Sequence, residues 1–481
     1  MPLFSLPVDV VELIFDNIIV SRRIARVMRI RLVNGQFRYF IDNSIFRLRI
    51  LNEYALYGFF WPAAHSSARD SLPYLHSYLM HEVLRAQPAA TSRLGRIRLA
   101  AKTLNGSDGD LECLSSLVCL AIRADVSDLL SPWHDNSEYS NRRDDGTEAD
   151  VFVAAAYLGR KDYVARIISK SKQSCEDLYF DSFYSRVFGC ALDAATIQGN
   201  IEIIKLLLSR LPEYRNAGTL TDSVLNGMVY DNHVSHRAET CHHEAVFDFV
   251  LDTLQTAQSK SDDQTLHASV LKGALCYASS PNSFERAVTL VPPYFRSYFP
   301  YYFPSLNEML MRNIEMGKVE MVRYLLSKAV SPNLDLEGFT PIMQAIKAGN
   351  DTIVRMLLDY DADPTYQTRD RNNALMTAVW HGRLAMANIL LDHGVDPNDG
   401  FPPPVALAVY KENMSMFQLL RDCGARLDTA ETGGLVMELA HSNRLSSMQD
   451  VLVHEGVSRD IILDHKLSYN TLSKRYHSLL R

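Results

Sequence analysis

The sequence predicts an all-α protein, built mainly as a solenoid of helix-turn-helix repeats with short hairpin loops and preceded by a small helical bundle. A repeating pattern carries the prediction, because Gly349 and Gly382 occupy the same place in two aligned segments and lie 33 positions apart. The composition supports it, since 47% hydrophobic and 22% charged residues are typical of a chain that folds around a core. The length of 481 residues also fits a repeat array, which grows in one dimension.

The clearest repeats lie between Leu334 and Asp428. They read LDLEGFTPIMQAIKAGNDTIVRMLLDYDADP, QTRDRNNALMTAVWHGRLAMANILLDHGVDPN and GFPPPVALAVYKENMSMFQLLRDCGARLD. Thr340 supplies a capping hydroxyl and Pro341 suits the first turn of a helix. The two glycines let the chain leave that helix in a left-handed conformation. Each segment is therefore expected to form an inner helix, a turn and an outer helix.

Other positions of the pattern have equally specific physical roles. Small residues are expected where inner helices cross, and these are Ala345, Ala378 and Ala408. An apolar ridge is expected on the outer helices, formed by Leu357, Leu358, Leu390 and Leu391. Gly394 and Gly424 are expected to end the outer helices, and Asp361 stands at the equivalent position.

This pattern resembles the ankyrin repeat. Fainter copies place Gly159, Gly199 and Gly317 in the same register, and the segment 435–457 repeats the rhythm once more. We expect about nine or ten units in residues 111–463, with degenerate middle units around 223–254 and 266–291, atypical outer units and a tail at 464–481. The resemblance implies a surface that binds proteins, and it implies no catalytic activity.

In the ankyrin pattern, the two positions before the turn glycine face the concave groove. The residues predicted to contact a protein partner there are Tyr157, Leu158, Gln198, Lys347, Trp380, His381, Tyr410 and Lys411, with the hairpin residues Asp335, Asp370 and Arg371. Large aromatic side chains at these positions indicate binding hot spots, because they supply contact area at small entropic cost. The alternative is that the same rings pack within the solenoid.

The N-terminal residues 1–50 resemble an F-box. The segment LPVDVVELIFDNIIV opens with Leu-Pro, and a later segment carries the apolar positions of that pattern. The resemblance implies docking on the Skp-type adaptor of a cullin-RING ubiquitin ligase, through Leu6, Pro7, Val10, Ile14, Leu32, Val33 and Phe37. The alternative is a plain helical cap on the repeats, joined to them by a helical linker at 51–110.

Arginine is concentrated in this N-terminal region, with Arg22, Arg23, Arg26 and Arg29 close together between Ser21 and Ile50. Such charge would steer docking on an acidic adaptor. A basic amphipathic helix also binds lipid or nucleic acid phosphates, and a solvated helix face is a further alternative. The net charge of −7 argues against nucleic acid as a partner of the whole chain.

One cluster has residues that bind metals. HVSHRAETCHHE contains the weak candidate zinc ligands His233, His236, Cys241 and His243, but their spacing lacks a paired-cysteine motif, and a solvated polar loop is the alternative. The sequence has no phosphate-binding glycine loop and no hydrolase or metalloprotease motif. We therefore expect no enzymatic activity, no cofactor and no metal.

The remaining composition bears on compartment and assembly. Seven scattered cysteines without a close pair favour reduced thiols in the cytoplasm or nucleus, and no membrane span is expected. The aromatic segment 294–303 is predicted to plug an imperfect core, the alternative being an exposed partner loop. The function predicted is a monomeric substrate-recognition subunit of a ubiquitin ligase, which holds an unknown protein substrate; the alternative is an ankyrin scaffold with no role in ubiquitination.

Overall fold

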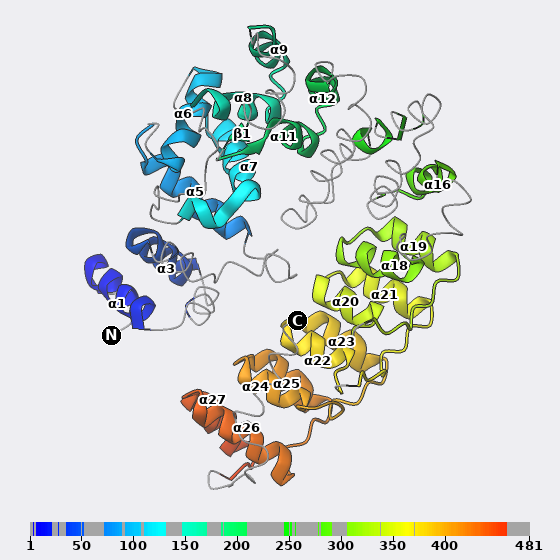
Figure 1. Ribbon diagram of the computed structural model, residues 1–481. Coiled ribbons are helices and arrows are strands. Elements are labelled where there is room, and N and C mark those ends of the chain that lie inside the picture. Colours follow the sequence, from blue (N-terminus) through cyan, green and yellow to red (C-terminus); the bar gives the residue numbers. More distant parts are fainter. Residues whose placement is uncertain are drawn as a thin grey trace, which may run out of the picture. The chain divides into compact units, whose positions relative to one another are not determined.

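In the residues that it describes, the computed structural model is mostly helical, and it divides into two units, residues 1–270 and 271–481 (Figure 1). It describes residues 6–21, 35–49, 72–88, 92–106, 110–130, 147–170, 184–208, 245–252, 280–290 and 305–458, apart from single gaps at 186, 250, 337 and 370, and a few isolated residues besides. Each unit is described by itself.

The second unit is a stack of helix pairs. Its helices are α16 (Pro281–Leu290), α18 (Leu306–Glu315), α19 (Val319–Ser327), α20 (Pro341–Ala348), α21 (Asp351–Asp359), α22 (Ala374–Trp380), α23 (Leu384–Asp392), α24 (Pro404–Tyr410), α25 (Met414–Asp422), α26 (Ala430–Ser442) and α27 (Ser446–His454). The inner helices α18, α20, α22, α24 and α26 pack on one another in sequence order, and each is followed by an outer helix (Figure 1).

The predicted helix starts and turns are confirmed in this unit. The Thr340 hydroxyl accepts a hydrogen bond from the Met343 amide, and Pro341 is the first residue of α20. Gly349 follows α20 with a φ of 75°, and Gly382 follows α22 with a φ of 66°. These left-handed residues turn the chain from the inner helix into the outer one.

Small inner residues and apolar outer residues build the core. Ala345, Ala378 and Ala408 are fully buried, as the pattern predicts for crossing helices. Leu357 and Leu390 are also fully buried, so the outer helices seal the stack. At roughly 25 cal/mol per Å² of apolar surface, this repeated burial is the main stabilising term of such an array.

Asparagines fasten one hairpin to the next repeat. The Asn333 side chain donates to the carbonyl of Asp361 at 2.9 Å and accepts from the amide of Asp363 at 2.7 Å. Asn398 makes the same two bonds, to Gly424 at 3.1 Å and from Arg426 at 2.8 Å. Each bridge satisfies a carbonyl left open where an outer helix ends.

The first unit contains a series of helices and one short hairpin. Its elements are α1 (Val8–Ser21), α3 (Gly35–Leu48), α5 (Leu72–Arg85), α6 (Arg93–Asn105), α7 (Leu111–Leu130), α8 (Thr147–Tyr157), α9 (Lys161–Lys170), β1 (Tyr184–Ser185), β2 (Gly189–Cys190), α11 (Ala191–Ile197) and α12 (Ile201–Leu208). The strands pair antiparallel. Helices α8 with α9 and α11 with α12 form two pairs, turned by Gly159 and Gly199 at φ of 74° and 71°.

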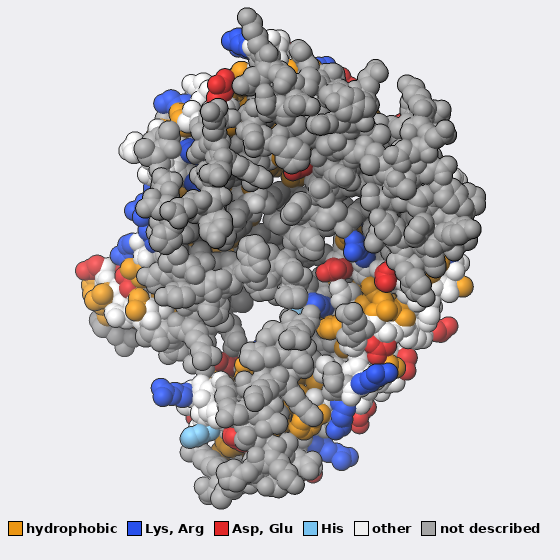
Figure 2. Space-filling model, viewed as in Figure 1, with side chains coloured by type: hydrophobic (Ala, Val, Ile, Leu, Met, Phe, Trp, Pro, Cys, Tyr) orange, Lys and Arg blue, Asp and Glu red, His pale blue; other side chains and the backbone are white. Residues whose placement is uncertain are grey.

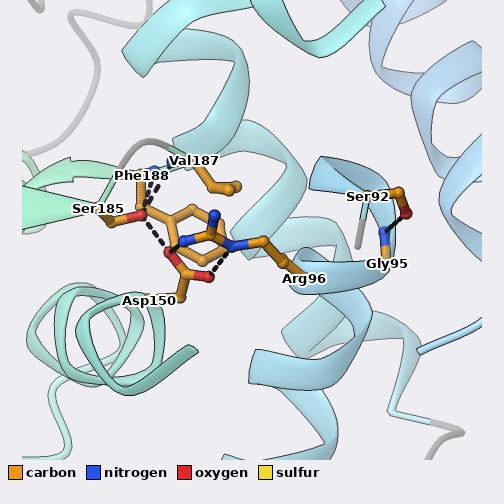
Figure 3. A network of polar contacts seen from close by, with 7 residues as sticks. All are labelled: Ser92, Gly95, Arg96, Asp150, Ser185, Val187 and Phe188. Atoms are coloured by element: carbon orange, nitrogen blue, oxygen red, sulfur yellow. Dashed lines mark hydrogen bonds and ion pairs between the residues drawn. The ribbon is translucent and has the colours of Figure 1, made fainter. Parts of the chain in front are cut away.

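A buried ion pair fixes the middle of this unit (Figure 3). The Arg96 guanidinium of α6 donates to both carboxylate oxygens of Asp150 on α8, at 2.6 and 3.0 Å. The Ser185 hydroxyl donates to Asp150 at 2.6 Å and accepts from the amides of Val187 and Phe188. Because every strong partner is satisfied, the network holds β1 and the start of α8 on α6.

At the N-terminus α1 packs against α3. Phe15 is fully buried and stacks on Phe40, with ring centroids 5.4 Å apart. Arg47 donates to Glu12 at 3.2 Å and to Asp16 at 2.8 Å, so these two carboxylates of α1 offset its charge. The helical pair is present, while the F-box interpretation of it stays a prediction.

Candidate protein-binding surface

The positions predicted to face a partner follow one another on the inner helices of the second unit. Lys347 is the residue before the end of α20, Trp380 ends α22, and Tyr410 ends α24. Since these inner helices stack in order, the side chains lie along one line, just before each turn. We call this line, with the hairpins beside it, the inner face.

Trp380, Tyr410 and Lys411 form an aromatic and cationic cluster. The rings of Trp380 and Tyr410 stack with centroids 6.0 Å apart and planes 10° apart. The Lys411 ammonium lies 3.7 Å from the centroid of the Trp380 ring, a cation–π contact. Trp380 is only 8% exposed, whereas Tyr410 and Lys411 are half-buried. The indole is therefore mainly a packing group that positions the other two side chains for contact.

Lys347 occupies, one repeat earlier, the position that Trp380 holds. Its ammonium lies 5.1 Å from the Phe339 ring centroid, and burial lowers the pKa of Lys347, an effect that the nearby Glu315 carboxylate opposes. A partly desolvated cation on an aromatic ring gains strongly from an acceptor brought by a partner. His381, also predicted here, is half-buried.

The hairpins add polar groups beside the line. Asp335 is exposed and accepts from the Gly338 amide at 2.9 Å and from the Tyr366 hydroxyl at 3.0 Å. Arg371 is exposed, with its guanidinium carbon 5.9 Å from the Phe401 ring centroid. Asp370 lies outside the described residues.

Tyr366 was missed by the pattern, because hairpin tips vary between repeats. It is 37% exposed, and the hydrogen bond to Asp335 is the largest cause that raises the pKa of its hydroxyl. A tyrosine held at a hairpin tip offers a partner a fixed ring and hydroxyl. The sequence signal that could have indicated Tyr366 is its place in the hairpin one repeat after that of Asp335.

Tyr157, also predicted to contact a partner, has little open surface in the structure. Its side chain is 4% exposed, because the end of α8 packs against α11 within the first unit. This is the packing alternative that the same ring pattern allows. Leu158 and Gln198, in the equivalent turns of the first unit, are half-buried.

The residues predicted to bind an adaptor have mixed environments. Pro7 and Val10 are exposed, and Leu6, Ile14 and Phe37 are half-buried. Phe37 contacts Phe15 edge-on, with centroids 5.5 Å apart, so it serves the packing of α1 on α3. Leu32 and Val33 lie outside the described residues.

Further apolar side chains are exposed on α1. Leu13 is 62% exposed and Val20 is 73% exposed, and Figure 2 shows hydrophobic side chains at the surface over this helix. With Val10 they lie within about a quarter of the helix circumference. Apolar side chains at the surface of a helix in this way form a patch suited to a partner.

The histidine-rich segment lies outside the described residues, as does the aromatic segment 294–303. Among the residues that the structure describes, no group of three His, Cys, Asp or Glu side chains is placed to hold a metal ion. In the same part of the chain, no helix combines the length and apolar content needed to cross a bilayer.

Comparison with known proteins identifies the repeat. The family model for ankyrin repeats, in three copies, matches residues 310–401, which include α20 to α23. A putative ankyrin repeat protein of fowlpox virus is 30% identical over 127 residues, which are 26% of this chain and 31% of that protein. Human ankyrin repeat, SAM and basic leucine zipper domain-containing protein 1 is 32% identical over 98 residues, 19% of this chain and 20% of that protein.

A bacterial enzyme also matches in part. The phosphocholine transferase AnkX of Legionella pneumophila is 30% identical over 177 residues, 33% of this chain and 18% of that protein. The chain thus spans a third or less of each of these three relatives. It contains ankyrin repeats, and ankyrin repeats are protein–protein interaction modules that are typically not enzymatic.

Proposed function

We propose that the chain binds a protein partner through the inner face of its second unit. The observation that carries the proposal is the cluster of Trp380, Tyr410 and Lys411, in which a buried indole holds a phenol and a cation at the end of α24. Lys347 adds a second cation, at the position that Trp380 and Tyr410 hold in the next two repeats, and Asp335 with Tyr366 adds a polar rim. Aromatic anchors with a polar rim are the usual anatomy of a binding hot spot.

Affinity capture of the full chain from cell extract, with quantitative mass spectrometry, tests this proposal. We expect the combined variant Tyr410→Ala, Lys411→Glu to lose the partner that the unmodified chain recovers. Arg323→Glu on the outer helix α19 is the matched control, because Arg323 is exposed and lies away from the inner face. Recovery of the partner in equal amount by the Tyr410→Ala, Lys411→Glu variant would contradict the proposal.

We propose further that the repeat array extends beyond the matched residues, over about 111–463. Helix pairs with the same left-handed turns support this, at Gly159 and Gly199 in the first unit and at α26 with α27 in the second. In this proposal residues 1–50 are an adaptor-binding segment, 51–110 a linker and 464–481 a tail. The site of action is the cytoplasm or nucleus, in keeping with the free thiols of Cys113, Cys190 and Cys423.

The finer function that we propose is substrate recognition for a cullin-RING ubiquitin ligase, with α1 docked on a Skp-type adaptor. The exposed apolar patch of Val10, Leu13 and Val20 supports it. Binding of the purified adaptor to the full chain is the test. Leu13→Glu is expected to abolish the complex, and Val8→Glu, which is equally exposed but on the opposite side of α1, is expected to preserve it.

If the unmodified chain fails to bind the adaptor, the ligase role is wrong. The ankyrin scaffold without ubiquitin chemistry then remains, since the inner-face experiment is independent of α1.

A further inference from the structure

A second surface lies on the opposite side of the repeats, away from the inner face. A groove of about 920 Å³ runs between the outer helices α23 and α25. Its lining includes Leu384, Ala385 and Ile389 from α23 and Met414, Ser415 and Leu419 from α25. The proposed binding function does not use these helices.

Three kinds of side chain follow one another along the groove at helical spacing. Leu384 and Met414 open the two helices and are 41% and 43% exposed. One turn later the amides Asn388 and Gln418 line the groove. One further turn on, Asp392 and Asp422 are the last residues of α23 and α25, and both are exposed. Because successive outer helices run in the same direction, the groove has an apolar end and an acidic end.

The acidic end has a local cost. A carboxylate at the C-terminus of a helix meets the negative end of the helix dipole, which is unfavourable. The amides hold the carboxylates in place, since Asn388 donates to Asp392 at 3.1 Å and Gln418 donates to Asp422 at 2.8 Å. An aspartate also ends α21, so the aspartates are distinguished by their place: Asp392 and Asp422 line one groove together with two exposed apolar side chains.

We propose that this groove binds an amphipathic helix of a protein partner, with apolar side chains on Leu384 and Met414 and a lysine or arginine between Asp392 and Asp422. The distance from one end of α23 to the other is about 12 Å, or two turns and a fraction of a helix. A partner helix lying in the groove therefore carries its basic residue about two turns from its apolar contact. Arg355 of α21 and His393 also line the groove. Since the Arg355 charge repels a basic residue, the attraction for the partner's cation comes from Asp392 and Asp422.

A synthetic helix tests the pairing. The probe is an alanine-rich, fluorescently labelled helix with leucines on one face and two arginines about two turns further along. We expect saturable binding to the full chain by fluorescence anisotropy, with affinity at least about tenfold lower in the double variant Asp392→Asn, Asp422→Asn. A probe with glutamates in place of the arginines is expected to bind the unmodified chain as weakly as the arginine probe binds the double variant.

Asp359→Asn is the matched control. Asp359 ends α21 in the same register but does not line the groove, so its replacement should leave affinity unchanged. Removing these aspartates is expected to keep or raise the unfolding temperature, which separates lost binding from lost folding. No saturable binding, equal binding of the glutamate probe, or an equal loss in Asp359→Asn would each overturn the proposal.

Discussion

At the scale of single residues, the turn between inner and outer helix requires a left-handed backbone. Gly317, Gly349 and Gly382 supply it without strain, at φ between 66° and 75°. Glu412 and Arg444 occupy the same turn in the last two pairs, at φ of 54° and 55°. A side chain costs about 1–2 kcal/mol in this conformation, so the last repeats are locally less stable than the pattern allows.

Arg444→Gly should therefore stabilise the chain. The relief of strain is partly offset by the entropy of glycine, which leaves a gain of up to about 1 kcal/mol in the free energy of unfolding. Gly349→Ala should destabilise by about 1–2 kcal/mol. Urea unfolding followed by circular dichroism measures both, and a loss of stability in Arg444→Gly would contradict this account of the turn.

Lys318 gives the stability a predictable pH dependence. Burial, together with the smaller effect of the nearby Arg312 charge, lowers the pKa of this ammonium to about 8. The unfolded chain has an ordinary lysine pKa near 10.4, so between these values the unfolded state binds more protons and stability rises with pH. From pH 8 to 10.5 the native chain should gain up to about 3 kcal/mol relative to Lys318→Met.

Urea unfolding at a series of pH values measures this difference. The exposed Lys170→Met variant is the control and should follow the native chain in parallel. A constant offset between the native chain and Lys318→Met across the window would rule out the buried ammonium as its cause.

Replacing Asp150 shows how much a buried ion pair contributes to stability, in comparison with an exposed one. Asp150→Ala removes the carboxylate that pairs with the buried Arg96 charge, which costs about 3–5 kcal/mol. Glu202→Ala removes an exposed carboxylate that pairs with Lys161 and Lys205, and should cost far less stability because water already solvates these charges. Thermal unfolding of the two variants measures the contrast, and similar losses would refute the structural role of the Asp150 network.

At the scale of elements, local signals predict the helix pairs well. Thr340 with Pro341 marks where α20 begins, and Gly349 marks where it ends, because caps and turns depend on neighbouring residues only. The buried network of Arg96, Asp150 and Ser185 could not be predicted in this way. Its members lie on three elements far apart in sequence, and no local pattern brings them together.

The asparagine hydrogen bonds between neighbouring hairpins are a second feature that the repeated pattern did not predict. Asn333 and Asn398 make the bridge, whereas Thr365 occupies the equivalent position between them. Thr365→Asn should reach the carbonyl of Gly394 and the amide of Asp396, and stabilise by about 0.5–1.5 kcal/mol.

Asn398→Ala should lose a comparable or larger amount, since the carbonyl and amide that it satisfies then have only solvent as a partner. Both changes are measured by urea unfolding of the full chain. If Thr365→Asn is neutral while Asn398→Ala is costly, the bridge geometry does not transfer between repeats.

At the scale of the whole molecule, ankyrin repeats and a protein-binding role follow from the repeated pattern, and the matched residues 310–401 agree. Which rings face solvent does not follow from that pattern. Tyr157 and Trp380 hold equivalent positions and both are nearly buried, while Tyr410 keeps a partly open face. The exposure of each ring depends on how tightly the neighbouring helix packs against it. The residues of one repeat do not determine that packing.

The central claim is that the inner face of the second unit holds a protein. Hydrogen exchange of the full chain, alone and bound to the partner recovered by affinity capture, tests it most directly. Binding should slow exchange in the turns at 347–350, 380–383 and 410–413 and in the hairpin at 335–339, with the outer helices unchanged. Slowed exchange confined to α21, α23 and α25, or no change in the turns, would contradict the claim.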